Sequence, residues 1–252
     1  MLKRILFFVL IGIFIILMSI SGFYIIHWLL ENHENDILIN HIREEARLEN
    51  TSMMNGMSSL EDNAQNDYQI DFILLKNQNP NTYAWLNVKG TNIDYPVVQA
   101  TDNEYYLNHS FDNSYNGAGW VFMDYRNQAD EINKNVVIYG HNRKDGSMFG
   151  TLKRVLTKDW QNNEENHIIT LMFEDECKKY EVFSTYTIEV EDYYIQTNFE
   201  NDKEFETFIK KMKDRSNHLY QVEVHKEDEI LTLSTCSNTN YRVVLHAKLI
   251  KE

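Results

Sequence analysis

The chain has 252 residues, of which 43% are hydrophobic, enough for one ordinary globular domain plus an appendage. Its formal net charge is -14, with 38 acidic against 24 basic side chains. Such an acidic body repels nucleic acid and anionic lipid headgroups, so we exclude nucleic acid as a partner. The two cysteines, Cys177 and Cys236, lack the C-x-x-C spacing of redox and zinc sites. We therefore expect no metal and no cofactor, while a single Cys177–Cys236 bridge stays open for an exported chain.

The N-terminus carries an uncharged run long enough to cross a membrane. Residues 5–26 would span roughly 33 Å as a helix. Lys3 and Arg4 precede the run and acidic residues follow it, which predicts a cytoplasmic N-terminus and an extracellular body. The alternative is a cleaved signal peptide, since Ser19 and Ser21 resemble a small-residue cleavage site. Because the apolar run continues past that site, we favour a single-pass anchor over residues 1–27.

The segment after the anchor is polar. Residues 28–50 have the pattern of a weakly amphipathic helix, and residues 51–67 are typical of a linker. Residues 68–77 are predicted to be helical, because the Asn-Pro pair that follows ends a helix. We therefore divide the chain into an anchor (1–27), a helical or linker stalk (28–67) and a main folded domain (68–252).

Short segments rich in Val, Ile, Tyr and Phe dominate the rest of the chain. The predicted strands cover residues 84–88, 93–98, 120–123, 136–139, 168–173, 180–189, 230–235 and 242–250. Two helices interrupt them, at 147–156 and at 202–213. The second has a capping-box pattern at Asn201 and Glu204 and one apolar face. About eight strands with few helices predict a mainly β fold, a closed antiparallel or mixed barrel with peripheral helices.

The last two predicted strands can be aligned as a hairpin. Matching their apolar faces pairs Leu233 with Leu245. This register sets Cys236 opposite Arg242 across the loop 237–241, on the more polar face and at the surface. A buried, unreactive cysteine and a solvated rim arginine are the alternatives.

Among the nine histidines, His141 has the most informative context, because it follows an apolar strand and a glycine. It could be a base presented at the rim of the sheet or only the cap of a turn. His246 shares the Cys236 face, but it lies four residues beyond Arg242, roughly 13 Å along the strand. We therefore consider His246 the weaker partner.

Three stretches resemble the sortase family. TLSTC at residues 232–236, followed by Arg242, is similar to the T-L-x-T-C…R ending of sortases. VVIYGHN at 136–142 with KDGSMFGTLKR at 144–154 resembles the catalytic-histidine strand and the following helix of class B sortases. Residues 91–107 resemble their early barrel strand and next turn. The resemblance implies an eight-stranded sortase barrel and extends from about residue 72 to 250.

The resemblance also implies a cysteine transpeptidase. Cys236 would be the nucleophile that cleaves a C-terminal sorting signal after Thr and forms a thioacyl enzyme. His141 would act as acid and base, and Arg242 would stabilise the oxyanion. We also assign Ser234 and Thr235, which directly precede the nucleophile, to substrate binding.

The implied partners are surface proteins with sorting signals of the Asn-Pro-x-Thr type and an amine of a peptidoglycan precursor. Ser237 and Asn238 follow Cys236 where many class B members have an acidic residue, so we assign no carboxylate to the site. The alternatives are a cell-wall cysteine hydrolase or protease, and a tethered β-barrel binding module without chemistry.

Overall fold

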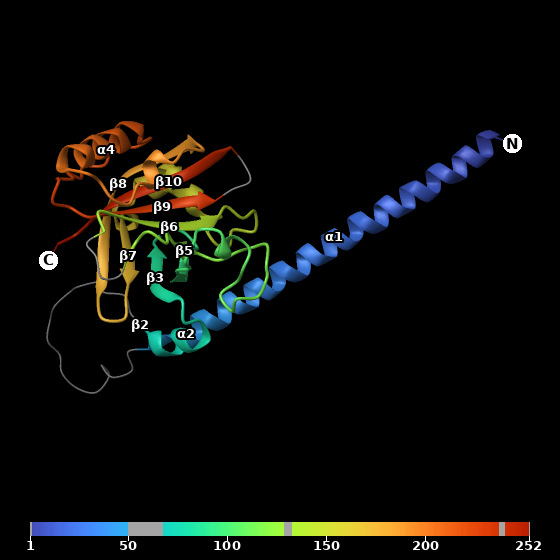
Figure 1. Cartoon of the computed structure of the whole chain (residues 1–252), viewed down its shortest axis with the longest axis horizontal. Helices are drawn as coiled ribbons and strands as arrows, with labels where there is room; N and C mark the ends of the chain where they lie inside the picture. The colour runs from blue at the N-terminus through green and yellow to red at the C-terminus, as the bar shows by residue number, and fades with distance from the viewer. Residues whose placement is uncertain (1, 50–67, 129–132, 237–239, 252) are drawn as a thin grey trace. The chain divides into compact units, whose positions relative to one another are not determined.

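The computed structural model describes residues 2–49, 68–128, 133–236 and 240–251 (Figure 1). The chain forms two compact units, Met1–Asn40 and His41–Glu252. The first unit consists of most of helix α1 (Leu2–Ala46). Among the described residues, one helix is long and apolar enough to cross a membrane, and it is α1. The weakly amphipathic helix predicted over 28–50 continues the same helix only to Ala46, because residues 47–49 form a strand. The predicted linker 51–67 lies outside the described residues.

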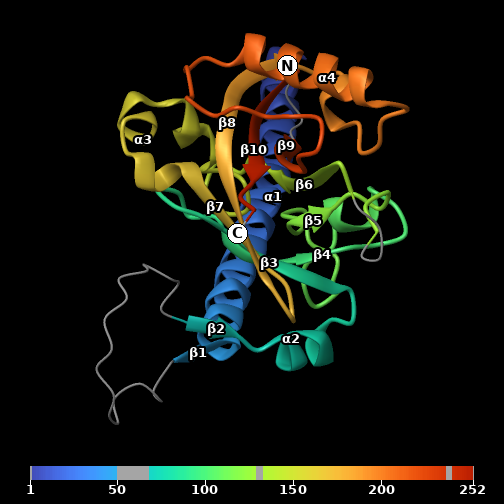
Figure 2. The ribbon, with the colours of Figure 1, turned by 90° about the vertical axis from the view of Figure 1, so that its left-hand side faces the viewer.

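The second unit contains a closed barrel of eight strands in the order β10-β8-β7-β3-β4-β5-β6-β9 (Figure 2). The strands are β3 (Thr82–Val88), β4 (Asp94–Val98), β5 (Phe122–Met123), β6 (Asn135–His141), β7 (Ile168–Met172), β8 (Cys177–Glu189), β9 (Ile230–Cys236) and β10 (Tyr241–Leu249). Each overlaps one of the eight strands predicted from the sequence, so the predicted barrel is confirmed. Fully buried side chains such as Trp85, Leu86 and Leu233 form its core.

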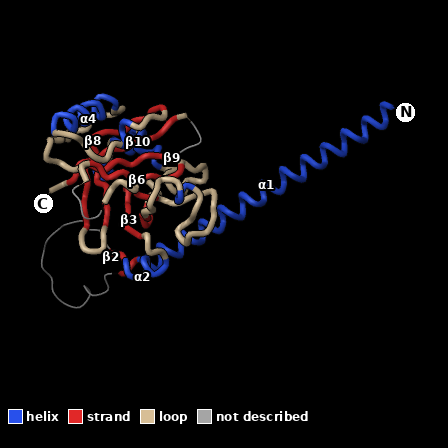
Figure 3. Tube along the Cα trace, in the orientation of Figure 1, coloured by secondary structure: helices blue, strands red, loops and turns tan. Residues whose placement is uncertain are grey.

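Most neighbouring strands are antiparallel, but β4 with β5 and β6 with β9 are parallel. Strands β6 and β9 lie side by side (Figure 3). Between them in the sequence, the chain forms β7, β8 and the intervening helices. In a parallel pair the carboxyl ends of both strands meet at the same edge of the sheet. This edge of the barrel therefore carries the last residues of β6 and β9.

The segment before the barrel contains a short sheet and a helix. Strand β1 (Arg47–Glu49) pairs with β2 (Tyr68–Ile70), and α2 (Phe72–Gln78) follows. The prediction of a helix over 68–77 is wrong for its first residues, because they pair with β1. Helix α2 begins after Asp71, whose side chain accepts a hydrogen bond from the Leu74 amide at 2.8 Å.

The end of α1 is bound to the barrel. Arg47 forms an ion pair with Asp94, whose other carboxylate oxygen accepts a hydrogen bond from Trp85 Nε1 at 2.7 Å. Arg43 donates to the Asp94 carbonyl at 2.9 Å. Residues 41–49 therefore belong to the compact unit by packing, although we assigned them to the stalk.

Helix α4 (Asp202–Arg215) covers the outside of the barrel over β8 and β10 (Figures 1 and 2). Its N-cap is Asn201, whose side chain accepts from the Glu204 amide at 3.1 Å, as the capping pattern predicts. Its apolar face is buried, and Ser184 of β8 donates to the Met212 carbonyl at 2.6 Å. The predicted position and packing face of this helix are confirmed.

The predicted helix 147–156 is wrong in its first half. Met148 has a φ of +50° and Gly146 has a φ of +86°, and such residues cannot belong to a right-handed helix. Only a 3-10 turn, η3 (Leu152–Leu156), and the short helix α3 (Lys158–Gln161) form here. The other 3-10 turns within the described ranges are η2 (Tyr105–Leu107), η4 (Glu164–His167) and η5 (Tyr193–Ile195).

Candidate active site

The carboxyl ends of β6 and β9 bring His141 and Cys236 together. The parallel register pairs Tyr139 with Ser234 and, at the end of both strands, His141 with Cys236. Partners on neighbouring strands are about 4.8 Å apart in the backbone. The side chain of Cys236 lies outside the described residues, so its placement rests on this backbone register.

The His141 ring is held by a backbone carbonyl. Its Nε2 lies 2.7 Å from the carbonyl oxygen of Leu107, in the turn η2. A carbonyl oxygen only accepts hydrogen bonds, so Nε2 must carry a proton. The nitrogen that can take up or release a proton is therefore Nδ1. Sequence reasoning missed Leu107, because a main-chain acceptor leaves no mark on residue type.

The hairpin register places Arg242 at the same edge. Strand β10 pairs Leu245 with Leu233 and Val244 with Ser234, as the matching of apolar faces predicts. Continuing this register by two residues brings Arg242 opposite Cys236. Arg242 is half-buried and pairs with a residue of β8 on its other side. The loop residues 237–239 lie outside the described residues.

Ser234 and Thr235 are both only 1% exposed. Ser234 Oγ shares a hydrogen bond with Tyr194 OH at 3.0 Å, and Thr235 Oγ1 accepts from the Val243 amide at 3.0 Å. Their side chains therefore hold the strand in place, and their assignment to substrate binding stays a prediction.

The polar face of the hairpin is covered rather than exposed, which corrects the expectation that it lies at the surface. His246 is fully buried beside β8 and α4, with Nε2 2.8 Å from Tyr186 OH and Nδ1 2.8 Å from Thr232 Oγ1. Burial, helped by the nearby Arg215 charge, lowers the pKa of His246 to about 3. His246 is thus neutral at physiological pH, and it pairs with Thr232, four residues before Cys236.

The register also decides the question of a disulfide. Strands β8 and β9 both run antiparallel to β10, so their first residues lie at the same end of the sheet. Cys177 is exposed at the start of β8, whereas Cys236 ends β9. The six residue steps from Ile230 to Cys236 already span roughly 20 Å, while a disulfide needs Cα atoms within about 7 Å. A Cys177–Cys236 bridge is therefore excluded.

The acidic residue nearest to His141 in the sequence, Asp145, is engaged elsewhere. Arg143 forms an ion pair with it at 2.9 Å, and Ser147 Oγ donates to it at 2.7 Å. Burial acts to raise the pKa of Asp145, but these hydrogen bonds outweigh burial and lower it.

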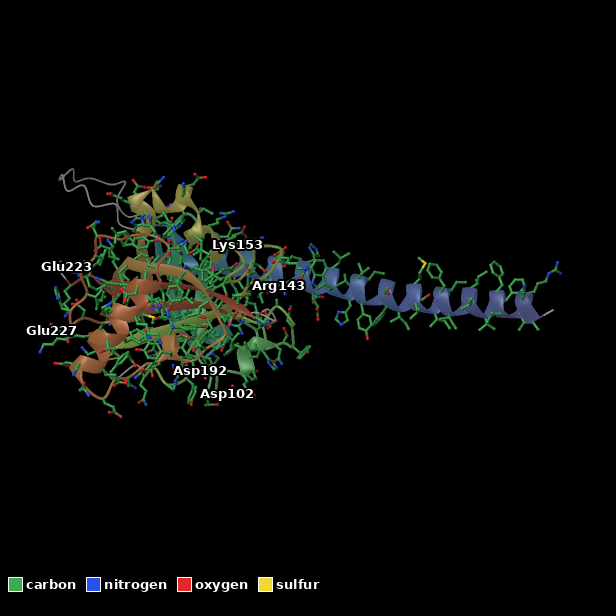
Figure 4. All side chains as sticks on the ribbon, turned by 90° about the horizontal axis from the view of Figure 1, so that it is seen from above. Asp102, Arg143, Lys153, Asp192, Glu223 and Glu227 are labelled. Atoms are coloured by element: carbon green, nitrogen blue, oxygen red, sulfur yellow. The ribbon has the colours of Figure 1, made fainter. Side chains whose placement is uncertain are left out.

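In Figure 4, Arg143 and Lys153 lie toward one side of the second unit, and Asp102 and Asp192 lie toward the other. No group of three or more metal-binding side chains occurs within the described part of the chain.

Known proteins with the same fold and sequence pattern identify the chain. The family model for the sortase domain matches residues 86–250, which is more than half of the chain. Sortase B of Listeria monocytogenes is 40% identical over 182 residues, covering 70% of this chain and 72% of the relative. Sortase B of Staphylococcus aureus is 37% identical over 186 residues, covering 71% of this chain and 75% of the relative.

A solved structure agrees with these sequence matches. The crystal structure of sortase B from B. anthracis superposes with a TM-score of 0.74 at 32% identity, covering 89% of this chain and all of the other. The closed barrel, the TLSTC strand and these relatives lead to one conclusion: this chain belongs to the sortase family as a class B sortase, and it is a cysteine transpeptidase.

Proposed function

We propose that Cys236 is the nucleophile of this transpeptidase, that His141 transfers the protons and that Arg242 stabilises the oxyanion. The observation that carries this assignment is the pairing of His141 with Cys236 at the ends of two parallel strands. Residues in register on neighbouring strands share a face of the sheet. A thiol and an imidazole at these positions form the pair that cysteine transfer chemistry needs.

In the first half-reaction, Nδ1 of His141 takes the proton of the Cys236 thiol, because only the thiolate is an effective nucleophile. The sulfur attacks the carbonyl carbon of the scissile peptide bond. As the C–N bond breaks, His141 returns the proton to the leaving amine, and a thioester remains on the enzyme. Throughout these steps the Leu107 carbonyl keeps Nε2 protonated.

In the second half-reaction, an acceptor amine attacks the thioester. His141 takes the proton that this amine loses, the new amide bond forms, and the sulfur leaves as the thiolate. Arg242 donates hydrogen bonds to the negatively charged oxygen of both tetrahedral intermediates. The register that brings Arg242 opposite Cys236 supports this role.

Sortases act on proteins with a sorting signal and on an amine nucleophile. For this chain we propose a signal of the Asn-Pro-x-Thr type, cleaved after Thr, and an amine of a peptidoglycan precursor. The class B membership supports both choices. The wall-side acceptor requires that the barrel faces outward, which the order of charges around residues 5–26 supports.

The proposed arrangement is a single-pass anchor over residues 1–27, a stalk over 28–67 and the catalytic domain over 68–252. The length and hydropathy of α1 support the anchor. Residues 41–49 would be the part of the stalk that packs with the barrel, because they belong to the same compact unit. The catalytic domain would then stand on the extracellular side of the cell membrane.

A peptide assay with the full chain in detergent micelles tests the proposal. A panel of peptides with different sorting signals is incubated with a small amine, and the products are identified by mass spectrometry. We expect transfer of the amine to the new C-terminal Thr for Asn-Pro-x-Thr peptides. Release of the free acid as the main product, despite excess amine, would indicate a hydrolase, and unchanged peptide would indicate a binding module.

The two cysteines give a matched pair of variants. Cys236→Ala should abolish transfer while the barrel still folds, because Ala suits the same small volume. Cys177→Ala should transfer at the normal rate, since Cys177 is exposed at the other end of the sheet. Retained transfer in Cys236→Ala would end the assignment of the nucleophile.

A further inference from the structure

We propose that the loop 105–120 orients the His141 imidazole and that Gly119 is the positioning residue of this loop. The inference rests on the proposed function, in which His141 carries the proton. It adds a group that the sortase motifs do not contain, a backbone carbonyl held at a fixed place by a glycine. The inference is based on the contacts that this loop makes with the His141 ring.

The carbonyl of Leu107 is fixed because its neighbour Tyr106 is anchored in the core. Tyr106 is 1% exposed, and its hydroxyl accepts hydrogen bonds from the side-chain amides of Asn79 and Asn81, both at 2.9 Å. The Tyr106 carbonyl accepts from the Trp120 amide at 2.9 Å. The two arms of the loop are thus joined one residue before the acceptor of His141.

The second arm is equally well fixed. Trp120 is 1% exposed, and its Nε1 donates to the Pro96 carbonyl at 2.9 Å. The Gly119 amide donates to the Asn116 carbonyl at 2.9 Å. With both arms held, the Leu107 carbonyl has little freedom to follow a ring that moves.

Gly119 lies where the two arms and the histidine ring meet. A Cβ at this position would be 2.6 Å from the Tyr106 carbonyl oxygen, 2.8 Å from the Leu107 carbonyl oxygen and 3.0 Å from His141 Cδ2. Its φ is +59°, a left-handed conformation that favours glycine. Any side chain here would push the Leu107 carbonyl and the His141 ring away from their present positions.

We expect this contact to control the tautomer and orientation of the His141 ring and to have little effect on substrate affinity. A fixed acceptor on Nε2 holds the imidazole in one tautomer and one orientation, so Nδ1 remains the site of proton exchange. A buried carboxylate performs this task in Ser-His-Asp triads. Here a neutral main-chain oxygen performs it, consistent with the absence of an acidic residue at Ser237 and Asn238 in the sequence.

The first test compares two glycine variants in the full chain in detergent micelles. Gly119→Ala should lower kcat for acylation about 10- to 100-fold and leave KM near its normal value, as expected from the loss of one hydrogen bond to a charged ring. Gly90→Ala is the matched control. Gly90 also has a positive φ, +73°, and a Cβ there would be 2.8 Å from Trp160 and Asn166 side-chain atoms, away from His141. It should lower stability without lowering kcat.

The second test uses the wild-type chain, so it does not depend on the folding of Gly119→Ala. With 15N-labelled histidine, the Nε2–H proton of His141 should give an observable NMR signal that exchanges slowly with water. The exposed ring of His225 should give none at the same pH. A His141→Gln variant assigns the signal.

The outcomes separate this inference from the proposed function. If His141→Gln still acylates, the proposed role of His141 is wrong. If His141→Gln is inactive while Gly119→Ala has a normal kcat, or Gly90→Ala loses as much kcat as Gly119→Ala, only the role of Gly119 is overturned. A rapidly exchanging Nε2–H of His141 in the wild type would also overturn it.

Discussion

The buried His246 makes the barrel sensitive to acid in a way that one substitution can isolate. Asn135 Oδ1 can only accept, so Thr232 donates its single hydroxyl proton to it, at 2.7 Å. Thr232 must then accept from His246 Nδ1, which carries a proton. The other ring nitrogen, Nε2, therefore accepts from Tyr186 OH. This pattern of donors and acceptors fits a neutral His246, and burial of the ring disfavours its protonated form.

The magnitude follows from the two pKa values of His246. Burial lowers its pKa in the folded chain to about 3, while an unfolded histidine has a pKa of about 6.5. The stability from the neutral ring is fully present above pH 6.5 and is lost as the pH falls toward 3, because the unfolded state binds the proton first. At pH 5 the loss relative to pH 8 is about 2 kcal/mol. This loss depends mainly on the pKa of the unfolded histidine, since pH 5 lies well above the pKa of His246 in the folded chain.

We expect His246→Asn to reveal this contribution. An amide can still donate to Thr232, but the bond to Tyr186 is lost, so the variant should be less stable at pH 8 by about 1–3 kcal/mol. It has no imidazole to protonate, so the stability gap to the wild type should shrink by about 2 kcal/mol between pH 8 and pH 5. The other titrating groups are common to both proteins and cancel in this comparison.

The assay is urea unfolding of the full chain in detergent micelles at both pH values, followed by tryptophan fluorescence. Trp85, Trp120 and Trp160 are at most 3% exposed and report on the barrel. His225→Gln is the control, because it removes an exposed imidazole that lies outside the buried network. A gap between His246→Asn and the wild type that is the same at pH 5 and pH 8 would refute the reasoning.

Three further predictions test the site, the covering helix and the topology. Arg242→Lys should fold normally but acylate about a hundred- to thousandfold more slowly, because Lys lacks the planar guanidinium that we propose as the donor to the oxyanion. A near-normal rate in Arg242→Ala would remove Arg242 from the mechanism. Phe208→Ala should lower the free energy of unfolding by about 3–5 kcal/mol, since this α4 side chain is fully buried, whereas Thr207→Ala on the exposed face should change it by less than about 0.5 kcal/mol. Protease added to intact protoplasts should digest the barrel, and finding most of the protein as a processed soluble form would contradict the membrane anchor.

The strands could be predicted because their signal is local. Val, Ile, Tyr and Phe runs between turn residues located all eight barrel strands, and the period of two fixed the hairpin register at Leu233 and Leu245. The helix 202–213 was equally visible, since capping and amphipathicity both lie within one segment.

What could not be predicted depends on contacts between distant segments. The parallel pairing of β6 with β9 joins residues more than ninety positions apart, and the spacing of His141 and Cys236 in the sequence does not encode it. The Leu107 carbonyl is a main-chain group and has no residue signature. The polar side chains on one face of β9 suggested that this face lies at the surface. The alternation of residue types shows that a face is polar, but it does not show whether another element covers it. The covering helix α4 comes from another part of the chain.

The buried hydrogen bonds on the covered face of β9 also help to fix the position of Cys236. Along one face of β9, Thr232 is bound to His246 and Asn135, and Ser234 is bound to Tyr194. Cys236 is the next residue in the same alternation. The strand that carries the proposed nucleophile is thus fixed by side-chain hydrogen bonds on one face and by backbone pairing along both edges. A reacting group on such a strand keeps its place relative to His141 during turnover, because moving it would break buried hydrogen bonds.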